Sequence, residues 1–191
     1  MRVLVRAANL RWIAVALALL VADAATAQTQ VEYLGLSFPA QVAGFARGSS
    51  HDFEKSHPGL GYGVKYARAA FYANIYIYDL SRKSISDDPK SAIVSAQYKQ
   101  AEGDIFGQKK SGRYRNVALR SRYTIRDARQ RERMVCGAFT LTRSDRTHDS
   151  YLCVTSWNNK FVKFRLSAPL HKNNDAQARQ FLDAWARLLW P

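Results

Sequence analysis

Three short apolar runs and both cysteines of the chain lie within residues 133–167, which read RMVCGAFTLTRSDRTHDSYLCVTSWNNKFVKFRLS. β-Branched and aromatic residues are concentrated in these runs, about Arg133–Thr142, Ser150–Trp157 and Phe161–Ser167, which is typical of strands. Links of only a few residues join them, and short links between strands favour antiparallel hairpins. We therefore expect an antiparallel meander.

The two cysteines define a register for the first of these hairpins. If Cys136 lies opposite Cys153, then Val135 lies opposite Val154 on the other face of the pair. Because side chains alternate between the two faces of a strand, a slip of one residue would exchange the faces. This register predicts that one face of the hairpin is apolar.

The same reasoning extends to the neighbouring strands on both sides. A turn centred on Asn159 sets Phe164 opposite Val154, and a preceding strand over residues 113–125 brings Tyr123 to the same face. Three hairpins then agree on one buried face, on which we expect the C-terminal helix to pack.

The opposite face of this predicted sheet carries basic side chains. Arg122 and Arg165 fall in one row with the two cysteines, and Arg120 and Lys163 fall in the adjacent rows, with no acidic residue among the twelve positions. Arginine offers fixed, bidentate donors to phosphate and carboxylate groups. The four residues are therefore a predicted anion-binding surface, although a solvated face, or one partly covered by a helix, fits the pattern as well.

Residues 1–27 have the three-part layout of a cleavable signal peptide. Three arginines precede an uncharged apolar run from Trp12 to Ala22, and Ala25-Thr26-Ala27 forms a small-x-small cleavage site before Gln28. This run is too short for a membrane anchor, which needs roughly 20 apolar residues. We expect cleavage after Ala27 and a periplasmic or secreted protein, with no transmembrane segment in the mature chain and a single domain over residues 28–191.

The chain is strongly basic, with 29 Lys and Arg, 15 Asp and Glu and a formal net charge of +14. Loss of the leader removes three arginines and one aspartate and leaves about +12. Such a charge favours polyanionic partners. Because an exported protein rarely meets nucleic acid, we expect an anionic envelope component instead, unless the charge simply reflects the proteome of the organism. In an oxidising compartment, two cysteines predict one disulfide, Cys136–Cys153, which leaves no cysteine for a metal.

The remaining elements complete an α+β pattern. We expect a strand over residues 31–38, a loop over 48–63, and two strands near 62–67 and 71–80, the second of them central because it is apolar on both sides. A helix is predicted from Asp88, as N-cap, and Pro89 to Gly107. A second helix follows Asn174, which forms an approximate capping box with Gln177. The predicted fold is an antiparallel sheet packed by a central helix and a C-terminal helix.

Two further groups of residues suggest other functions. His51, Asp52, Glu54 and His57 crowd the 48–63 loop and could serve a small envelope hydrolase, but their spacing matches no zinc motif. Five tyrosines on the two neighbouring strands form a possible stacking platform or a packed core surface: Tyr62, Tyr66, Tyr72, Tyr76 and Tyr78. We predict no metal and no cofactor.

Four segments resemble a family of exported proteobacterial proteins that has no assigned activity. They are residues 36–39 (LSFP), 57–61 (HPGLG), 74–80 (NIYIYDL) and 160–165 (KFVKFR). The order of predicted elements is also similar to PsbP-like α/β sandwiches. That resemblance implies an accessory or assembly factor rather than a catalyst, and it carries over no functional residue. A non-enzymatic binding protein is thus the leading expectation, and a hydrolase or a protein-interaction module are the alternatives.

Overall fold

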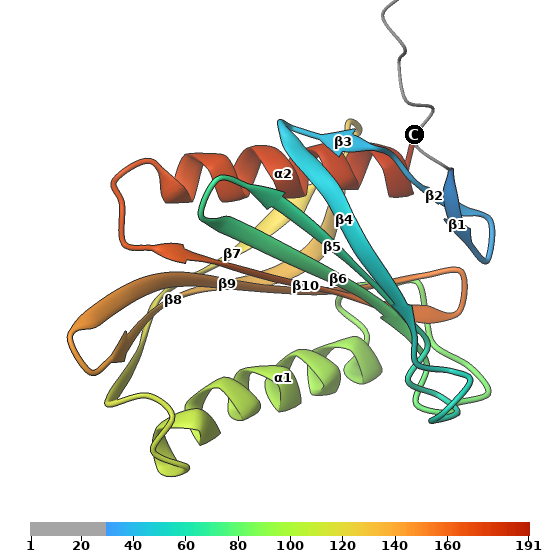
Figure 1. Cartoon of the computed structure of the whole chain (residues 1–191). Helices are drawn as coiled ribbons and strands as arrows, with labels where there is room; N and C mark the ends of the chain where they lie inside the picture. Colours follow the sequence, from blue (N-terminus) through green and yellow to red (C-terminus); the bar gives the residue numbers. More distant parts are fainter. Residues whose placement is uncertain (1–29) are drawn as a thin grey trace, which may run out of the picture.

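The computed structural model describes residues 30–191 (Figure 1). Within this range, eight strands form one antiparallel sheet in the order β3-β4-β5-β6-β10-β9-β8-β7, and β1 and β2 form a separate hairpin. The strands are β1 (Val31–Tyr33), β2 (Leu36–Phe38), β3 (Gln41–Val42), β4 (Phe45–Asp52), β5 (Tyr62–Arg68), β6 (Phe71–Tyr78), β7 (Asn116–Arg126), β8 (Glu132–Arg143), β9 (Arg146–Trp157) and β10 (Lys160–Pro169). The predicted signal peptide, residues 1–27, lies outside the described residues.

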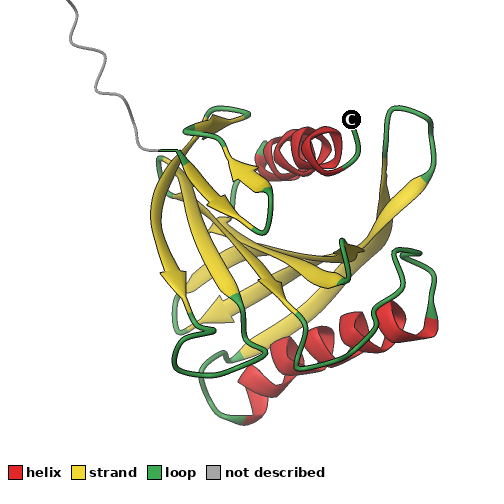
Figure 2. Cartoon of the chain, turned by 90° about the vertical axis from the view of Figure 1, so that its right-hand side faces the viewer, coloured by secondary structure: helices red, strands yellow, loops and turns green. Residues whose placement is uncertain are grey.

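Two helices, α1 (Ala92–Lys110) and α2 (Asn174–Leu189), lie on opposite faces of the sheet (Figure 2). The antiparallel sheet with two helices confirms the predicted α+β class. Strand β6 lies between β5 and β10 and is central, as predicted.

Each helix buries its own apolar cluster against the sheet. On the α2 face, Phe181 and Trp185 pack with both cysteines and Phe164. On the α1 face, a separate cluster joins residues of the helix and the sheet: Val94, Tyr98, Ala101, Ile105, Phe139, Leu152 and Val154. The prediction that the C-terminal helix covers the face of Val154 is therefore wrong, because both faces of the central strands are apolar and α1 covers that one.

The predicted disulfide is confirmed. Cys136 and Cys153 are bonded across β8 and β9, with Cα atoms 4.1 Å apart, and both are fully buried. Val135 lies opposite Val154, as the register predicted.

Strand β10 is shifted by one residue from its predicted register. Asn158 and Asn159 both have left-handed φ angles, 48° and 60°, and they form a two-residue turn in which Trp157 pairs with Lys160. Such tight turns match the twist of the flanking strands. Phe164 consequently lies opposite Cys153 rather than Val154, and every side chain of β10 is on the face opposite to the predicted one.

Strand β7 contains a bulge that the prediction lacked. Leu119 pairs with Phe139 as expected, but Ser121 pairs with Ala138, so that Arg120 is an extra residue in the strand. Beyond the bulge, Tyr123 lies opposite Cys136 and not Val135.

Several predicted boundaries also differ. Helix α1 begins after Ser91, whose hydroxyl accepts a hydrogen bond from the amide of Val94, and it continues past Gly107 to Lys110. Helix α2 follows Asn173, because the side chain of Asn174 is buried and donates to Asp149 and to the carbonyl of Pro169 instead of capping the helix. The predicted strand over residues 31–38 is the hairpin β1–β2, and β4 extends through the first part of the predicted 48–63 loop.

Candidate functional site

The four predicted anion-binding residues do not share a face. Arg120, the extra residue of the β7 bulge, lies on the α2 side, where its guanidinium group donates two hydrogen bonds to the Asp175 carboxylate, of 2.7 and 3.0 Å. A third contact joins it to the buried Asp149, 3.3 Å away. The bidentate hydrogen bond from Arg120 lowers the pKa of Asp175. Arg120 is therefore a structural ion-pair partner between the sheet and α2.

Arg122 lies on the α1 face and is also paired. Its guanidinium group donates three hydrogen bonds of 2.9 to 3.2 Å to the carboxylate of Glu102 in α1. It remains in one row with Arg165, but the row runs through Gly137 and Leu152 and not through the disulfide. The prediction that Arg120, Arg122, Lys163 and Arg165 share one face of the sheet is thus wrong, because Arg120 lies on the other face.

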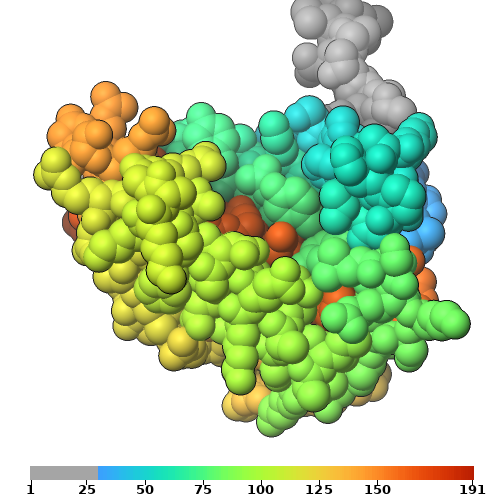
Figure 3. Space-filling model, turned by 90° about the horizontal axis from the view of Figure 1, so that it is seen from below, coloured from blue at the N-terminus to red at the C-terminus, as the bar shows by residue number. Residues whose placement is uncertain are grey.

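Lys163 and Arg165 lie in a groove beside α1. The helix packs on β7, β8 and β9 and leaves part of this sheet face uncovered. Figure 3, which looks onto this face, shows a hollow between the yellow-green atoms of α1 and the green atoms of the strands beyond, with orange-red atoms of β10 at its floor. The hollow consists of three adjoining pockets, and Tyr76 contributes to the lining of all three. We refer to them together as the groove.

The first pocket, here called the cationic pocket, has a volume of about 390 Å³. Its lining includes Arg113, Lys163 and Arg165, with Tyr76 and Tyr114. Among the described residues that line the three pockets, Asp104 is the only carboxylate, and it makes no salt bridge with these cations. The pocket therefore has an excess of positive charge.

Arg165 and Lys163 make no salt bridge within residues 30–191, and the charge of Asp104, which raises the pKa of Lys163, acts on it without such a contact. The Nη1 atom of Arg165 is buried and makes no hydrogen bond. The Lys163 ammonium group lies 5.0 Å from the ring centre of Tyr76 and 5.2 Å from that of Tyr78, so that cation–π contacts provide its stabilisation. A buried polar atom without a hydrogen-bond partner, such as the Nη1 atom of Arg165, is uncommon in folded proteins and calls for an explanation.

The surroundings of these two cations disfavour their charge. Burial, followed by the charge of Arg165, lowers the pKa of Lys163. Burial also lowers the pKa of Arg165. An anion bound between them would raise both pKa values, because a nearby opposite charge favours the protonated form of each group.

The second pocket, here called the apolar pocket, has a volume of about 260 Å³ and lies next to the first. Phe53, Leu60 and Leu80 contribute to its lining, and Leu60 and Leu80 are 44% and 37% exposed. Lys163 and Asp104 line both pockets. The groove thus has a cationic part and an apolar part that meet at Lys163.

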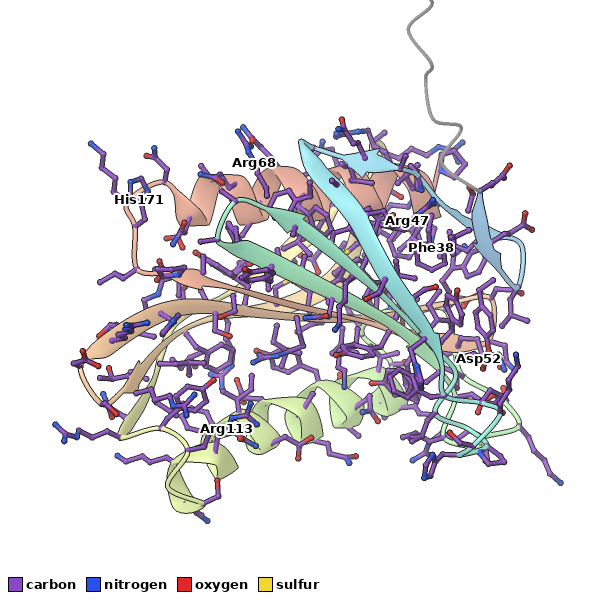
Figure 4. The ribbon with its side chains drawn as sticks, in the orientation of Figure 1. Phe38, Arg47, Asp52, Arg68, Arg113 and His171 are labelled. Carbon is purple, nitrogen blue, oxygen red and sulfur yellow. A yellow bond between two sulfur atoms is a disulfide. The ribbon has the colours of Figure 1, made fainter. Side chains whose placement is uncertain are left out.

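The loop over residues 53–61 is held in place by its own hydrogen bonds. The carboxylate of Glu54 accepts from the amides of Gly59 and Gly61, and the amide of Leu80 donates to the carbonyl of Gly59. A Cβ atom at Gly63 would lie 2.9 Å from the Phe53 ring, so glycine at this position allows the ring to lie over β5. Figure 4 places Asp52, which precedes this loop, near the N-terminal end of α1, and Arg113 near its C-terminal end.

A third pocket, here called the side pocket, extends the groove toward β4. It has a volume of about 390 Å³, and its lining includes Ser50, His51 and Lys65. His51 packs against the Phe53 ring, with ring centres 4.4 Å apart. Ser50 accepts a hydrogen bond from Tyr62.

The acidic and histidine residues of the 48–63 loop do not converge on one site. The His57 ring contacts the Ser56 hydroxyl at 3.0 Å on the exposed surface, whereas Glu54 binds backbone amides. In residues 30–191 no three His, Cys, Asp or Glu side chains gather as they would around a metal ion. No helix in the same range is long and apolar enough to cross a membrane.

The predicted tyrosine platform is only partly assembled. Tyr72, Tyr76 and Tyr78 point to the α1 side of β6, as predicted, and Tyr76 lines the groove. Tyr62 and Tyr66 pack instead with the α2-face core, so their inclusion in the platform is wrong.

A second concentration of positive charge lies at the end of α1 next to the β8–β9 hairpin. Six exposed cations, here called the cationic tip, make no salt bridge within the described chain: Lys109, Lys110, Arg113, Arg115, Arg143 and Arg146. Arg113 also lines the cationic pocket. The tip therefore borders the groove.

The sequence-based reasoning missed Asn74, Tyr114 and Arg113 as neighbours of Arg165. Asn74 pairs directly with Arg165 across β6 and β10, and the other two lie in the segment that joins α1 to β7. The Asn158-Asn159 pair was the available signal for the β10 register, since two asparagines favour a two-residue turn. No sequence signal placed the 111–115 segment.

Several solved structures have a similar arrangement of helices and strands. One of them is a PsbP protein. The solution structure of cyanobacterial PsbP from Synechocystis sp. PCC 6803 has a TM-score of 0.47 and 15% identity, and the match covers 80% of this chain and 96% of that one. The Ran-binding protein Mog1p of Saccharomyces cerevisiae gives a TM-score of 0.39 and 12% identity, with 84% and 89% covered. A Pseudomonas aeruginosa protein of unknown function gives 0.36 and 12%, with 80% and 93% covered.

No family model and no curated protein sequence matches the chain. A PsbP protein is thus among the similar solved structures, while membership of an exported proteobacterial family is not shown. At these identities and TM-scores, the similar structures identify no ligand and no function.

Proposed function

We propose that this protein is an exported, non-enzymatic binding protein whose groove captures an anionic component of the cell envelope. In this proposal the signal peptide is removed after Ala27, and residues 28–191 form the single mature domain. Lys163 and Arg165 bind the anionic group, whereas Arg120 and Arg122 serve only the structure.

The observation that carries the proposal is the buried Nη1 atom of Arg165, which has no hydrogen-bond partner in a pocket that also contains Lys163. Two neighbouring cations without a salt-bridge partner are costly to bury. A phosphate or carboxylate group would accept hydrogen bonds from both and offset their repulsion. The remaining basic residues of the predicted surface already have carboxylate partners.

The position of the cationic tip supports an envelope component as the source of the anion. Its six cations lie next to the groove and have no acidic partners in the described chain. Clustered cations near an anionic surface raise the rate and strength of association. The tip would therefore hold the opening of the groove close to anionic lipid or polysaccharide.

Calorimetric titration with methyl phosphate, a minimal anionic probe, tests the proposal. The wild-type protein is expected to bind with saturation, and Arg165→Met is expected to weaken binding roughly tenfold or more, the usual effect of removing a charged hydrogen bond. Arg122→Met is the matched control, because Arg122 lies in the same row of the sheet but is paired with Glu102.

Equal loss of binding in both variants would show non-specific attraction to a basic protein and would contradict the proposal. Absence of binding in the wild type would contradict it as well. Circular dichroism of each variant separates loss of binding from loss of fold.

A further inference from the structure

The groove offers two chemically different surfaces to one ligand. Its cationic pocket contains Arg165 and Arg113, and its apolar pocket contains Phe53, Leu60 and Leu80. Lys163, Tyr76 and Asp104 border both pockets, so the two surfaces are continuous along Lys163 and Tyr76, with Asp104 as the one carboxylate among the described residues at their junction. A ligand that fills the groove must therefore combine an anionic group with an apolar part.

We propose that the groove binds an anionic amphiphile, with its acid group on Lys163 and Arg165 and its apolar chain along Tyr76 to Phe53, Leu60 and Leu80. This inference rests on the proposed function, because it needs the anion site, and it adds the chemical class of the ligand.

The leucines at the rim support an apolar occupant. Leu60 and Leu80 are among the few large apolar side chains that stay substantially exposed, and they lie on adjoining segments joined by the hydrogen bond from the Leu80 amide to the Gly59 carbonyl. Leu80 also has a left-handed φ of 55°, a conformation that is strained for a residue with a Cβ atom. An apolar ligand in the pocket would cover the exposed side chains of both leucines.

The Phe53 ring gives the apolar part a rigid wall. It lines both the apolar and the side pocket, and its position depends on the missing Cβ atom of Gly63. The loop that follows it is closed by the Glu54 carboxylate, which accepts hydrogen bonds from two backbone amides. The apolar pocket is thus formed before a ligand arrives, which reduces the entropy cost of binding.

A purely polar or a purely apolar ligand would occupy only one part of the groove. An inorganic anion would leave the exposed leucines and the Phe53 ring without a role. An uncharged apolar ligand would leave the Arg165 Nη1 atom unpaired next to it, which costs free energy. An amphiphile satisfies both parts at once.

A chain-length series of alkyl phosphates tests the inference below the concentration at which these molecules form micelles. Methyl, butyl and octyl phosphate present the same headgroup and differ only in apolar length. For each methylene that enters the apolar pocket, the dissociation constant should fall roughly two- to fourfold. Octyl phosphate should therefore bind at least roughly tenfold more tightly than methyl phosphate.

Two variants at the rim make the test specific for the apolar pocket. Leu60→Ser combined with Leu80→Asn should abolish most of the gain with chain length and leave the binding of methyl phosphate unchanged. Leu170→Ser is the matched control, because Leu170 is 60% exposed and lies outside the groove, and it should keep the full gain.

The remaining outcomes distinguish failure of the amphiphile proposal from failure of the anion site itself. Saturable binding of all three phosphates with equal affinity would overturn the amphiphile and leave the anion site intact. A gain with chain length that the rim variants preserve would place the chain elsewhere and would also overturn it. Lack of binding by every member of the series would overturn the proposed function, and this inference with it.

Discussion

Lys163 and Arg165 are two residues apart on β10, and the alternation of a strand therefore places both on the α1 face. Tyr76 and Asn74 lie opposite them on β6, and Asp104 lines the same pocket without forming a salt bridge to either cation. Burial lowers the pKa of both groups, and the charge of Arg165 lowers the pKa of Lys163 further. Most other cations that approach the sheet core, such as Arg120 and Arg133, have an acidic partner.

The first prediction concerns the pKa of Lys163. Replacement of Arg165 by methionine removes a neighbouring positive charge and should raise the pKa of Lys163 toward its ordinary value of about 10.4. Titration of the Lys163 side-chain resonances by nuclear magnetic resonance measures this change. Arg68→Met, which alters an exposed arginine outside the groove, should leave the Lys163 titration unchanged. An unchanged pKa in Arg165→Met would contradict the proximity of the two charges.

The second prediction concerns the ion pair between Asp175 and Arg120. The hydrogen bonds from Arg120 hold the pKa of Asp175 below its value in the unfolded chain, so the pair stabilises the fold fully above about pH 4 and progressively less as the pH falls through the lower, folded-state value. Asp175→Asn should lower the free energy of unfolding by about 1 kcal/mol at pH 7, and the difference from the wild type should shrink below about pH 4.

Urea unfolding at a series of pH values measures the effect. Asp183→Asn is a suitable comparison, because Asp183 makes only an exposed i,i+4 pair with Arg179, and its effect should be smaller. A constant difference between wild type and Asp175→Asn from pH 7 to pH 3 would show that the charge of Asp175 is not responsible.

At the level of elements, the sequence predicts the strands well and their registers unevenly. The disulfide fixes β8 against β9, because two sulfur atoms must meet, and that register is correct. Strand β10 has no such covalent link, and the sequence Asn158-Asn159-Lys160 is compatible with a turn of two residues or of three residues. The predicted three-residue turn placed Arg165 on the wrong face of the sheet.

The bulge at Arg120 has a different cause. Residues 117–123 read VALRSRY, and the three consecutive polar residues 120–122 interrupt the alternation without showing which residue is the extra one. The bulge is stabilised by tertiary contacts of Arg120 with Asp175 and Asp149, which lie far along the chain.

The groove could not be predicted from the sequence either, because it too depends on tertiary contacts. Its shape is set by where α1 packs on the sheet and by which strands the helix leaves uncovered.

The third prediction tests the turn that sets the β10 register. Asn159 has a left-handed φ of 60°, and its side chain accepts a hydrogen bond from the amide of Ile85 at 2.7 Å and donates one to the carbonyl of Lys83. Asn159→Ala should therefore lower the free energy of unfolding by about 2 kcal/mol, from the lost hydrogen bonds and the strained φ.

Asn158→Gly provides the contrast within the same turn. Asn158 also has a left-handed φ, of 48°, and glycine adopts it without strain, so the free energy of unfolding should change by less than about 0.5 kcal/mol. Chemical unfolding of both variants measures the two values. Equal effects of the two substitutions would contradict the structural role of the Asn159 side chain.

On the scale of the whole molecule, the positive charge is unevenly placed. The predicted four-residue cationic face is not formed, because Arg120 lies on the α2 side and Arg122 is paired with Glu102 of α1. Six exposed cations without a salt bridge gather at the cationic tip, at one end of α1, and other such cations, for example Arg82 and Lys83, lie apart from it. The net charge of +14 for the full chain thus predicts attraction to anionic surfaces but not the place where it acts.

The fourth prediction is that the tip dominates binding to anionic membranes. Each cation near an anionic lipid surface contributes about 1 kcal/mol, so Lys109→Gln combined with Arg143→Gln should weaken binding to phosphatidylglycerol vesicles about 30-fold at low salt. Arg82→Gln combined with Lys83→Gln removes the same charge outside the tip and should have a much smaller effect. Sedimentation with vesicles measures both, and added salt should reduce all binding. Equal weakening by the two pairs would contradict a dominant tip.

The anion site in the groove is most directly tested by the Arg165 side chain itself. In a nuclear magnetic resonance titration with octyl phosphate, the Nε–Hε signal of Arg165 should shift with saturation, while that of Arg122, already paired with Glu102, should stay in place. A titration in which Arg122 and other exposed arginines shift and Arg165 does not would contradict the assignment of this groove as the binding site.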